Sequence, residues 1–215
     1  MASAELRHFV KNSKKVIATT TNYLPMLKIL NIEKPTVPIL FMKPTSSYIE
    51  EGQAIKLPHG FTVNQEIELG VVIGKRCKAV KESNAMEMVG GYCAALDMTA
   101  TCQMKEARSK GLSWLLGKGF DTACPVSRFI GKNEICDPNN VQLWSCVNGE
   151  LRQNGNTKDF IFSIPTLISY ISAYITLEPN DVVLTGTPPG MGPVKAGDII
   201  EGGIKDIVTF KFCVE

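Results

Sequence analysis

The apolar runs of this sequence are typical of β-strands, and they follow one another instead of alternating with helices. The clearest strand pattern covers residues 67–73, and similar short runs occupy 37–42, 181–184 and 207–214. Gly- and Pro-rich loops separate these runs. Strands that arrive in succession favour an α+β, mainly β fold over a doubly wound parallel sheet.

Helical periodicity is confined to a few segments, chiefly residues 104–114 and 164–177. Another local signal is the Asn148-Gly149 pair, which favours a two-residue β-hairpin turn between flanking strands. No internal repeat, low-complexity tract or linker divides the chain. Residues 1–215 are therefore predicted to form a single domain.

The charge balance argues against nucleic-acid and membrane partners. The 215 residues carry 23 Lys and Arg against 21 Asp and Glu, a net charge of +2, and no basic stripe is present. The longest apolar stretches, such as residues 167–177, are interrupted by Ser and Tyr and fall short of the roughly 20 residues that span a bilayer. We therefore expect no nucleic acid and no membrane among the partners.

The seven cysteines are scattered along the chain and form no Cys-x-x-Cys pair. Several lie within apolar runs, where cysteine acts as a small hydrophobe. The first residues lack the apolar core of a secretory signal. These features predict reduced thiols in a mitochondrial or cytoplasmic protein that is not secreted.

Three carboxylates lie at the ends of apolar strand patterns. Glu66 and Glu68 are two residues apart, so on a strand they project from the same face, about 6.6 Å from each other along the chain. Asp97 ends the apolar run 89–96. Such a set suits a hard cation such as Mg²⁺, because no Cys or His cluster accompanies it. The alternative is a solvated strand edge, since spacing alone does not bring the three together.

Two further segments have the composition of a ligand site. Lys118 lies between glycines in an apolar stretch, where a lysine is either partly buried and able to serve as an acid, base or anchor, or on a surface loop. The segment 184–193 is rich in Gly, Pro and Thr, which let backbone amides approach a ligand, although a structural turn has the same composition.

Five motifs are spread along the chain between about Lys15 and the C-terminus. They are Glu66-Ile-Glu68-Leu-Gly, Gly90-Gly-Tyr-Cys-Ala-Ala-Leu-Asp97, Lys118-Gly-Phe-Asp-Thr-Ala-Cys-Pro, Val147-Asn-Gly-Glu-Leu-Arg-Gln and Leu184-Thr-Gly-Thr-Pro-Pro-Gly-Met-Gly-Pro. In combination they resemble the fumarylacetoacetate hydrolase family. Within it, the chain is most similar to the small single-domain acylpyruvases and oxaloacetate decarboxylases.

The resemblance implies a mixed β-roll fold and a homodimer. It also implies Mg²⁺ or Mn²⁺ as cofactor, held by Glu66, Glu68 and Asp97. By the same resemblance Lys118 and Thr187 contact a small 2-oxo acid substrate, and Gly186 belongs to the substrate pocket.

One segment departs from the family pattern. Family members carry Gly-Arg-Asn-Tyr-x-x-His-x-x-Glu near the N-terminus, and its His and Glu activate water. Asn22 and Tyr23 match this motif, but Met26 and Ile29 stand at the His and Glu places. The resemblance places all four residues in the substrate pocket, where Met and Ile cannot take a proton.

Two more pocket places have lost their usual polar residue. Thr101 stands where the family commonly has an Arg that binds the substrate carboxylate, and Met104 stands at a Gln place. Loss of a general base costs about 10²–10⁴-fold in rate, so hydrolysis is expected to be weakened. Decarboxylation of oxaloacetate needs no activated water, and Lys118 remains as an acid or base for enol–keto tautomerisation.

The resemblance therefore implies a divalent-metal-dependent enzyme acting on 2-oxo or 1,3-dicarbonyl acids, by acylpyruvate hydrolysis or by decarboxylation or tautomerisation of oxaloacetate. Two alternatives remain open. One is a diverged paralogue whose more apolar pocket takes a less anionic substrate. The other is a non-catalytic protein that retains the fold for ligand binding or a structural role.

Overall fold

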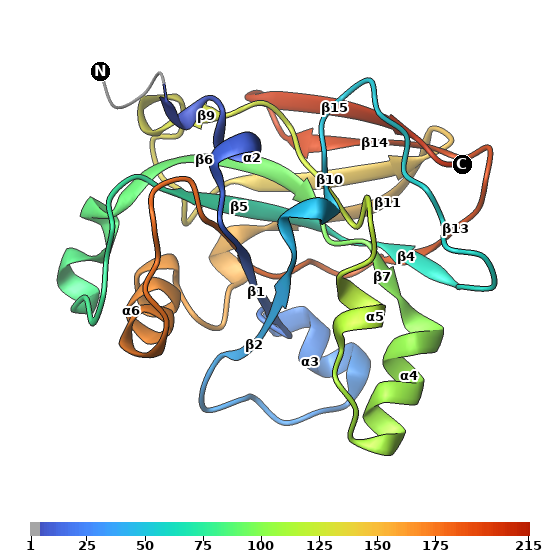
Figure 1. The fold of residues 1–215 in the computed structure, drawn as a ribbon, viewed down its shortest axis with the longest axis horizontal. Coiled ribbons are helices and arrows are strands. Elements are labelled where there is room, and N and C mark those ends of the chain that lie inside the picture. Colours follow the sequence, from blue (N-terminus) through green and yellow to red (C-terminus); the bar gives the residue numbers. More distant parts are fainter. Residues whose placement is uncertain (1–4) are drawn as a thin grey trace.

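The largest sheet of the computed structural model, which describes residues 5–215, has six strands in the order β2-β1-β12-β5-β6-β9 (Figure 1). Only its β1–β12 pair is parallel. The strands, in that order, are β2 (Ile39–Lys43), β1 (Val16–Thr20), β12 (Val182–Leu184), β5 (Ile67–Ile73), β6 (Val89–Leu96) and β9 (Ile130–Gly131).

Three smaller sheets complete the β-structure. An antiparallel four-stranded sheet has the order β11-β10-β14-β15, a three-stranded sheet has the order β13-β4-β7, and β3 pairs with β8. Their bounds are β11 (Glu150–Asn156), β10 (Gln142–Val147), β14 (Ile199–Ile204), β15 (Val208–Cys213), β13 (Gly192–Val194), β4 (Val63–Gln65), β7 (Thr99–Ala100), β3 (Tyr48–Ile49) and β8 (Cys124–Pro125). The α+β, mainly β fold class predicted from the sequence is confirmed.

Short helices surround these sheets (Figure 1). They are α2 (Phe9–Asn12), α3 (Leu24–Leu30), α4 (Thr101–Lys110), α5 (Leu115–Lys118) and α6 (Ile164–Tyr174). Helices α4 and α5 pack against each other beside β7. Within the described residues no helix is both long and apolar enough to cross a bilayer.

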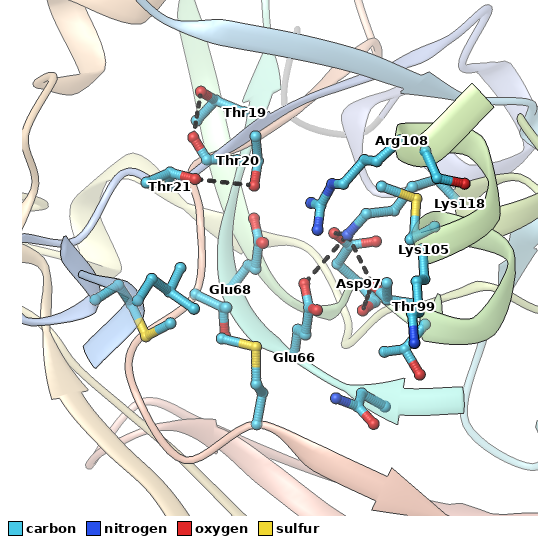
Figure 2. Close-up of a pocket in the computed structure, with 18 residues that line it drawn as sticks. Thr19, Thr20, Thr21, Glu66, Glu68, Asp97, Thr99, Lys105, Arg108 and Lys118 are labelled. Atoms are coloured by element: carbon cyan, nitrogen blue, oxygen red, sulfur yellow. Dashed lines mark hydrogen bonds and ion pairs between the residues drawn. The ribbon is translucent and has the colours of Figure 1, made fainter. Parts of the chain in front are cut away.

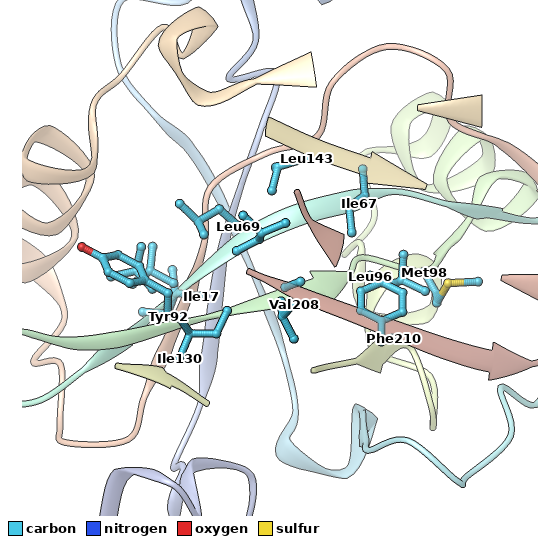
Figure 3. Close-up of a cluster of buried hydrophobic side chains, with 14 of the residues drawn as sticks. Ile17, Ile67, Leu69, Tyr92, Leu96, Met98, Ile130, Leu143, Val208 and Phe210 are labelled. Atoms are coloured by element: carbon cyan, nitrogen blue, oxygen red, sulfur yellow. The ribbon is translucent and has the colours of Figure 1, made fainter. Parts of the chain in front are cut away.

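The main core lies where the four-stranded sheet packs against β5 and β6 (Figure 3). Alternate residues of β5, including Ile67 and Leu69, join this core, whereas Val72 on the opposite face belongs to a second apolar cluster with Cys93 and Ala95. Both faces of β5 are therefore buried, which explains its almost continuous apolar sequence.

Two predicted helices differ from those observed in their ends. The helix predicted over 104–114 begins at Thr101 and ends at Lys110, because Gly111 adopts a left-handed conformation (φ 64°) and caps it. The helix predicted over 164–177 ends at Tyr174. The Asn-Gly hairpin is confirmed, joining β10 to β11.

Candidate metal centre and active site

A cavity of about 550 Å³ opens between β5, β6 and helices α3, α4 and α5 (Figure 2). Glu66, Glu68 and Asp97 line it, and each offers an oxygen within 4.8 Å of the others. All three residues are buried. The structure thus brings the predicted carboxylates together and excludes the solvated strand edge.

The pairing of β5 with β6 explains this convergence. Ile67 pairs with Leu96 and Glu68 with Ala95, so Glu66 lies opposite Asp97, whose amide donates a 2.8 Å hydrogen bond to the Glu66 carbonyl. Side chains alternate between the faces of a strand, so the three carboxylates share one face while their apolar neighbours enter the main core on the other.

Lys118 contacts two of the three carboxylates. Its Nζ lies 2.5 Å from Asp97 Oδ2, 3.2 Å from Glu66 Oε2 and 2.6 Å from the hydroxyl of Thr99. The residue is only 4% exposed, so it is not a surface-loop lysine. Burial opposes its charge, but Asp97 and Glu66 outweigh burial and raise its pKa, so the ammonium is protonated at neutral pH.

A second buried lysine, which was not predicted from the sequence, lies beside Asp97. Lys43, the last residue of β2, places Nζ 2.7 Å from Asp97 Oδ1 and donates to the carbonyls of Met98 and Lys118. Side chains alternate between the two faces of β2, so Lys43 shares the buried face with Phe41. This alternation is the sequence signal that could have indicated a buried Lys43.

Glu68 has no cation partner among residues 5–215. Its Oε2 accepts a 2.6 Å hydrogen bond from the amide of Gly186. Gly186 has a φ of +97°, and a Cβ there would lie 2.9 Å from the Cβ of Asn22, so glycine is required for this approach. The Gly186 amide therefore holds the carboxylate of Glu68, a predicted metal ligand, in place. Gly186 itself is not among the residues that line the cavity, so the expectation that it lines the pocket is not met.

Burial and mutual repulsion make the charged form of the carboxylates, above all Glu68, unfavourable when no metal ion neutralises them. Burial raises the pKa of Glu68, and the negative charges of Asp97 and Glu66 raise it further. Burial also raises the pKa of Glu66, although Lys118 opposes this. Burial would raise the pKa of Asp97 as well, but Lys118 and Lys43 outweigh it and the net shift is downward. This donor set fits a divalent oxygen-loving ion, which would neutralise the repulsion centred on Glu68.

Thr187 lines the cavity as expected, and its hydroxyl is held in place. Oγ1 donates to the carbonyl of Ile67 at 2.8 Å and accepts from Nε2 of Gln153 at 2.8 Å. Gln153 also accepts from the amide of Ile67 at 2.8 Å. One lone pair of the Thr187 hydroxyl remains for a ligand.

Helix α3 contributes an apolar wall that differs in part from the expectation. Met26 and Leu30 line the cavity, one turn apart on the same helix face. Ile29 is 64% exposed and lies outside the lining, because its position on the helix directs it to the adjacent face. The expectation that Ile29 lines the pocket is therefore not met.

Asn22 and Tyr23 are buried behind this wall and do not line the cavity. The Asn22 side chain donates to the carbonyls of Phe162 and Thr185 and accepts from the amide of Phe162, so it braces two loops. Tyr23 packs edge-on against Phe160 at a ring-centre distance of 5.0 Å. Both residues are thus placed for support of the site.

Helix α4 forms another wall of the cavity (Figure 2). Thr101 and Met104 line the cavity, as expected. Lys105 and Arg108 line it as well, and the sequence analysis did not single them out. Their spacing from Thr101 and Met104 is the signal that places all four on one helix face.

One known protein family matches nearly the whole chain. Residues 15–215 match the family model described as fumarylacetoacetate (FAA) hydrolase C-terminal. The human protein named oxaloacetate tautomerase FAHD1, mitochondrial, is 47% identical over 215 residues, covering 100% of this chain and 97% of that protein. A Dictyostelium discoideum protein named oxaloacetate decarboxylase, mitochondrial, is 45% identical over 206 residues, covering 95% and 94%.

Solved structures share the fold. A yeast fumarylacetoacetate hydrolase family protein superposes with a TM-score of 0.88 and 30% identity, covering 97% of this chain and 96% of that chain. The fumarylpyruvate hydrolase of Pseudomonas aeruginosa, solved with Mn²⁺ and pyruvate, superposes with a TM-score of 0.88 and 28% identity, covering 94% and 89%. With this sequence match and this fold, the chain belongs to the fumarylacetoacetate hydrolase family.

Proposed function

We propose that this chain is a divalent-metal-dependent enzyme that acts on small 2-oxo acids, by tautomerising or decarboxylating oxaloacetate in preference to hydrolysing acylpyruvates. The observation that carries the proposal is the convergence of three buried carboxylates with Lys118 in one cavity. Relatives 45–47% identical bear the names oxaloacetate tautomerase and oxaloacetate decarboxylase, which supports the same class of substrate here.

Glu66, Glu68 and Asp97 would hold the ion, which as Mg²⁺ or Mn²⁺ supplies a Lewis acid for the 2-oxo group. Lys118 holds a protonated ammonium inside the cavity, and its three N–H groups contact Asp97, Glu66 and Thr99. With Glu66 engaged in holding the ion, the N–H that contacts Glu66 would be released to donate to an enolate oxygen or to the substrate carboxylate. Thr187 adds a fixed hydroxyl acceptor nearby. Met26 and Leu30 cover one side with apolar surface and limit the access of water.

The lining of the cavity favours these reactions over hydrolysis. Its only acidic residues within the described chain are the three carboxylates of the proposed metal centre, and no histidine is among its lining residues. A hydrolase would need a separate base to generate hydroxide from water. Loss of CO₂ leaves an enolate that takes up one proton, which the Lys118 ammonium can donate. In ketonisation of the enol, the enol O–H proton would pass to solvent while Lys118 donates a proton to carbon, and solvent would reprotonate Lys118.

The test uses metal-stripped protein to which Mg²⁺ or Mn²⁺ is added back. We expect ion-dependent decay of the enol absorbance of oxaloacetate, or ion-dependent formation of pyruvate, faster than any hydrolysis of acetylpyruvate. A protein that hydrolyses acetylpyruvate at a comparable or higher rate would contradict the preference. A protein inactive on oxaloacetate with either ion would contradict the enzymatic proposal.

We also propose that the protein is a homodimer. Apolar side chains are exposed on α3, on the edge strand β2 and around α5, among them Ile29, Met42, Leu115 and Leu116. An apolar edge strand left unpaired invites association, and a second copy would cover it. Light scattering should give twice the 23.5 kDa chain mass, and a value of 23.5 kDa at micromolar concentration would contradict the dimer.

The compartment we propose is the mitochondrion. The human and Dictyostelium relatives carry "mitochondrial" in their names. Fractionation of cells expressing the chain with a C-terminal tag should place it with mitochondrial markers, whereas recovery in the cytosolic fraction alone would contradict this.

A further inference from the structure

We propose that Arg108 is a specificity residue that binds the second carboxylate of the substrate, the one not held at the metal centre, and thereby selects dicarboxylic 2-oxo acids. The inference rests on the proposed function, because it takes the carboxylate cluster as the site where the 2-oxo acid end is held. It concerns a residue on α4 that is separate from the three carboxylates and from Lys118.

The position of Arg108 on its helix directs it into the cavity. Thr101, Met104, Lys105 and Arg108 follow one face of α4 and all line the cavity. Side chains on a helix lean toward its N-terminus, so Arg108 leans back toward the turn that carries Met104. Figure 2 shows the Arg108 side chain pointing toward Lys118 and Asp97, among the residues that line the cavity.

Arg108 is held in this place by an aromatic ring. Its guanidinium carbon lies 5.3 Å from the ring centre of Trp114, in a cation–π contact. A guanidinium stacked on a ring keeps its edge N–H groups free, in the fork geometry that matches a carboxylate. The contact therefore orders the side chain without using its donors.

Arg108 and Lys105 have no anionic partner in the described part of the chain: neither makes an ion pair or a side-chain hydrogen bond there. The outward face of the same helix behaves differently, since Lys110 pairs with Glu106 at 2.8 Å. The cations of α4 are thus divided between a self-neutralised pair in solvent and two free charges at the cavity.

The charge balance of the cavity indicates that these two cations would neutralise a second substrate carboxylate. The three carboxylates against Lys118 and Lys43 leave one net negative charge, which a divalent ion together with one substrate carboxylate would neutralise. Without Arg108 and Lys105, a second substrate carboxylate would have only neutral lining residues beside it and no cation, which is unfavourable. Arg108, with Lys105 beside it, supplies the missing positive charge.

This assignment also answers the change at Thr101. From the sequence, a diverged paralogue whose more apolar pocket takes a less anionic substrate remained one open alternative. Arg108 lies seven residues further along the same helix face, about 10 Å along the axis, and brings a cation back to the cavity from a different position. The geometry favours an anionic substrate over a neutral one.

The experiment compares Arg108→Gln with Arg108→Lys, with Lys110→Gln as a control on the solvent face of the same helix. Calorimetry in the presence of Mg²⁺ uses two unreactive ligands of equal length, malate with a second carboxylate and 2-hydroxybutanoate with a methyl group in its place. We expect wild-type protein to prefer malate, Arg108→Gln to weaken malate at least about 10-fold and 2-hydroxybutanoate less than about 2-fold, and Lys110→Gln to change neither. Arg108→Lys keeps the charge but loses the guanidinium fork and its contact with Trp114, so it should recover only part of the malate affinity.

Kinetics with oxaloacetate provide the second readout. For enol–keto interconversion, Arg108→Gln should raise KM by at least about 10-fold and change kcat by less than about 3-fold, because the second carboxylate takes no part in that step and the contact acts mainly on binding. Decarboxylation does not serve for this readout, since that carboxylate is the group lost as CO₂. Equal weakening of both ligands, no weakening of either, or failure of wild-type protein to prefer malate would overturn the inference. If wild-type protein prefers malate through Arg108 but turns over no oxaloacetate, the proposed reaction fails and the carboxylate site stands.

Discussion

Glu66 and Asp97 face each other across the β5–β6 pair, joined by a 2.8 Å hydrogen bond from the Asp97 amide to the Glu66 carbonyl. Their side chains lie on the same face because the two residues are directly opposed. A shift of one residue in this pairing would turn a carboxylate toward the apolar core. The carboxylate cluster is therefore built into the strand register, and rigid backbone on both sides positions it.

Glu68→Gln should show that the carboxylate cluster lowers the stability of the ion-free protein and at the same time binds the ion. The amide keeps an oxygen for the hydrogen bond from Gly186 but removes the negative charge that burial, Asp97 and Glu66 disfavour. In ion-free protein we expect the free energy of unfolding to rise by about 1 kcal/mol, because an unpaired buried charge is relieved. Calorimetry should show Mn²⁺ affinity falling at least about 10-fold.

Glu87→Gln is the matched control, since Glu87 is exposed and does not line the cavity. It should alter neither stability nor Mn²⁺ affinity. If Glu68→Gln left Mn²⁺ affinity unchanged, Glu68 would not be an ion ligand.

The strands that carry the site could be predicted from the sequence, but the pairing of these strands that brings the three carboxylates together could not. The apolar runs predicted β5 and β6, and the observed bounds of β5 agree with the prediction. Register depends on which strands pair, and that is decided by contacts between segments distant in the sequence. Spacing alone therefore left open whether Glu66, Glu68 and Asp97 converge.

Other parts of the site carry little local signal. Lys43 follows a short strand pattern, and only the tertiary fold shows that its ammonium is buried beside Asp97. Helix α3 was not predicted, because Pro25 suggests a turn, although proline is tolerated in the first turn of a helix, where its missing N–H is not needed. Arg108 became significant only once α4 was seen to border the cavity.

Gly186→Ala should disturb the same site through the backbone. Its φ of +97° disfavours any side chain, and the added Cβ would lie 2.9 Å from the Cβ of Asn22. We expect a loss of about 1–3 kcal/mol in stability by chemical denaturation, together with weaker Mn²⁺ binding, because the amide that holds Glu68 is displaced. Gly60→Ala is the control: its φ is also positive (+78°), but nothing lies within 4 Å of the added Cβ, so Mn²⁺ affinity should be unchanged.

Asp198 should give the protein a pH-dependent contribution to stability far from the cavity. Burial opposes its charge, but hydrogen bonds from the Asn148 side chain and the Lys195 amide, both at 2.9 Å, outweigh burial and lower its pKa below 3.8. A lowered pKa stabilises the folded state above pH 3.8, and this contribution is lost as pH falls through the folded value.

Thermal unfolding of wild-type protein and Asp198→Asn measures this contribution. The variant should melt lower at pH 7, and the difference should shrink as the pH falls below 3.8. Asp121→Asn, at an exposed position, should follow the wild type throughout. If the difference in melting temperature between the two proteins did not change with pH, the charge of Asp198 would not be what stabilises the folded state.

The last prediction concerns the water-activating pair that Met26 and Ile29 replace. Met26 lines the cavity, so Met26→His places an imidazole in the cavity that holds the carboxylate cluster. Ile29 is exposed, but it lies three residues along the same helix, within reach of residue 26, so Ile29→Glu can accept a hydrogen bond from that imidazole. We expect the double variant to raise acetylpyruvate hydrolysis at least about 10-fold and to change oxaloacetate turnover less, because only hydrolysis needs activated water. Met26→Leu with Ile29→Glu lacks the imidazole and should show no gain. An equal gain in that control would mean that the glutamate acts alone, and no gain in either would mean that water activation is not what limits hydrolysis.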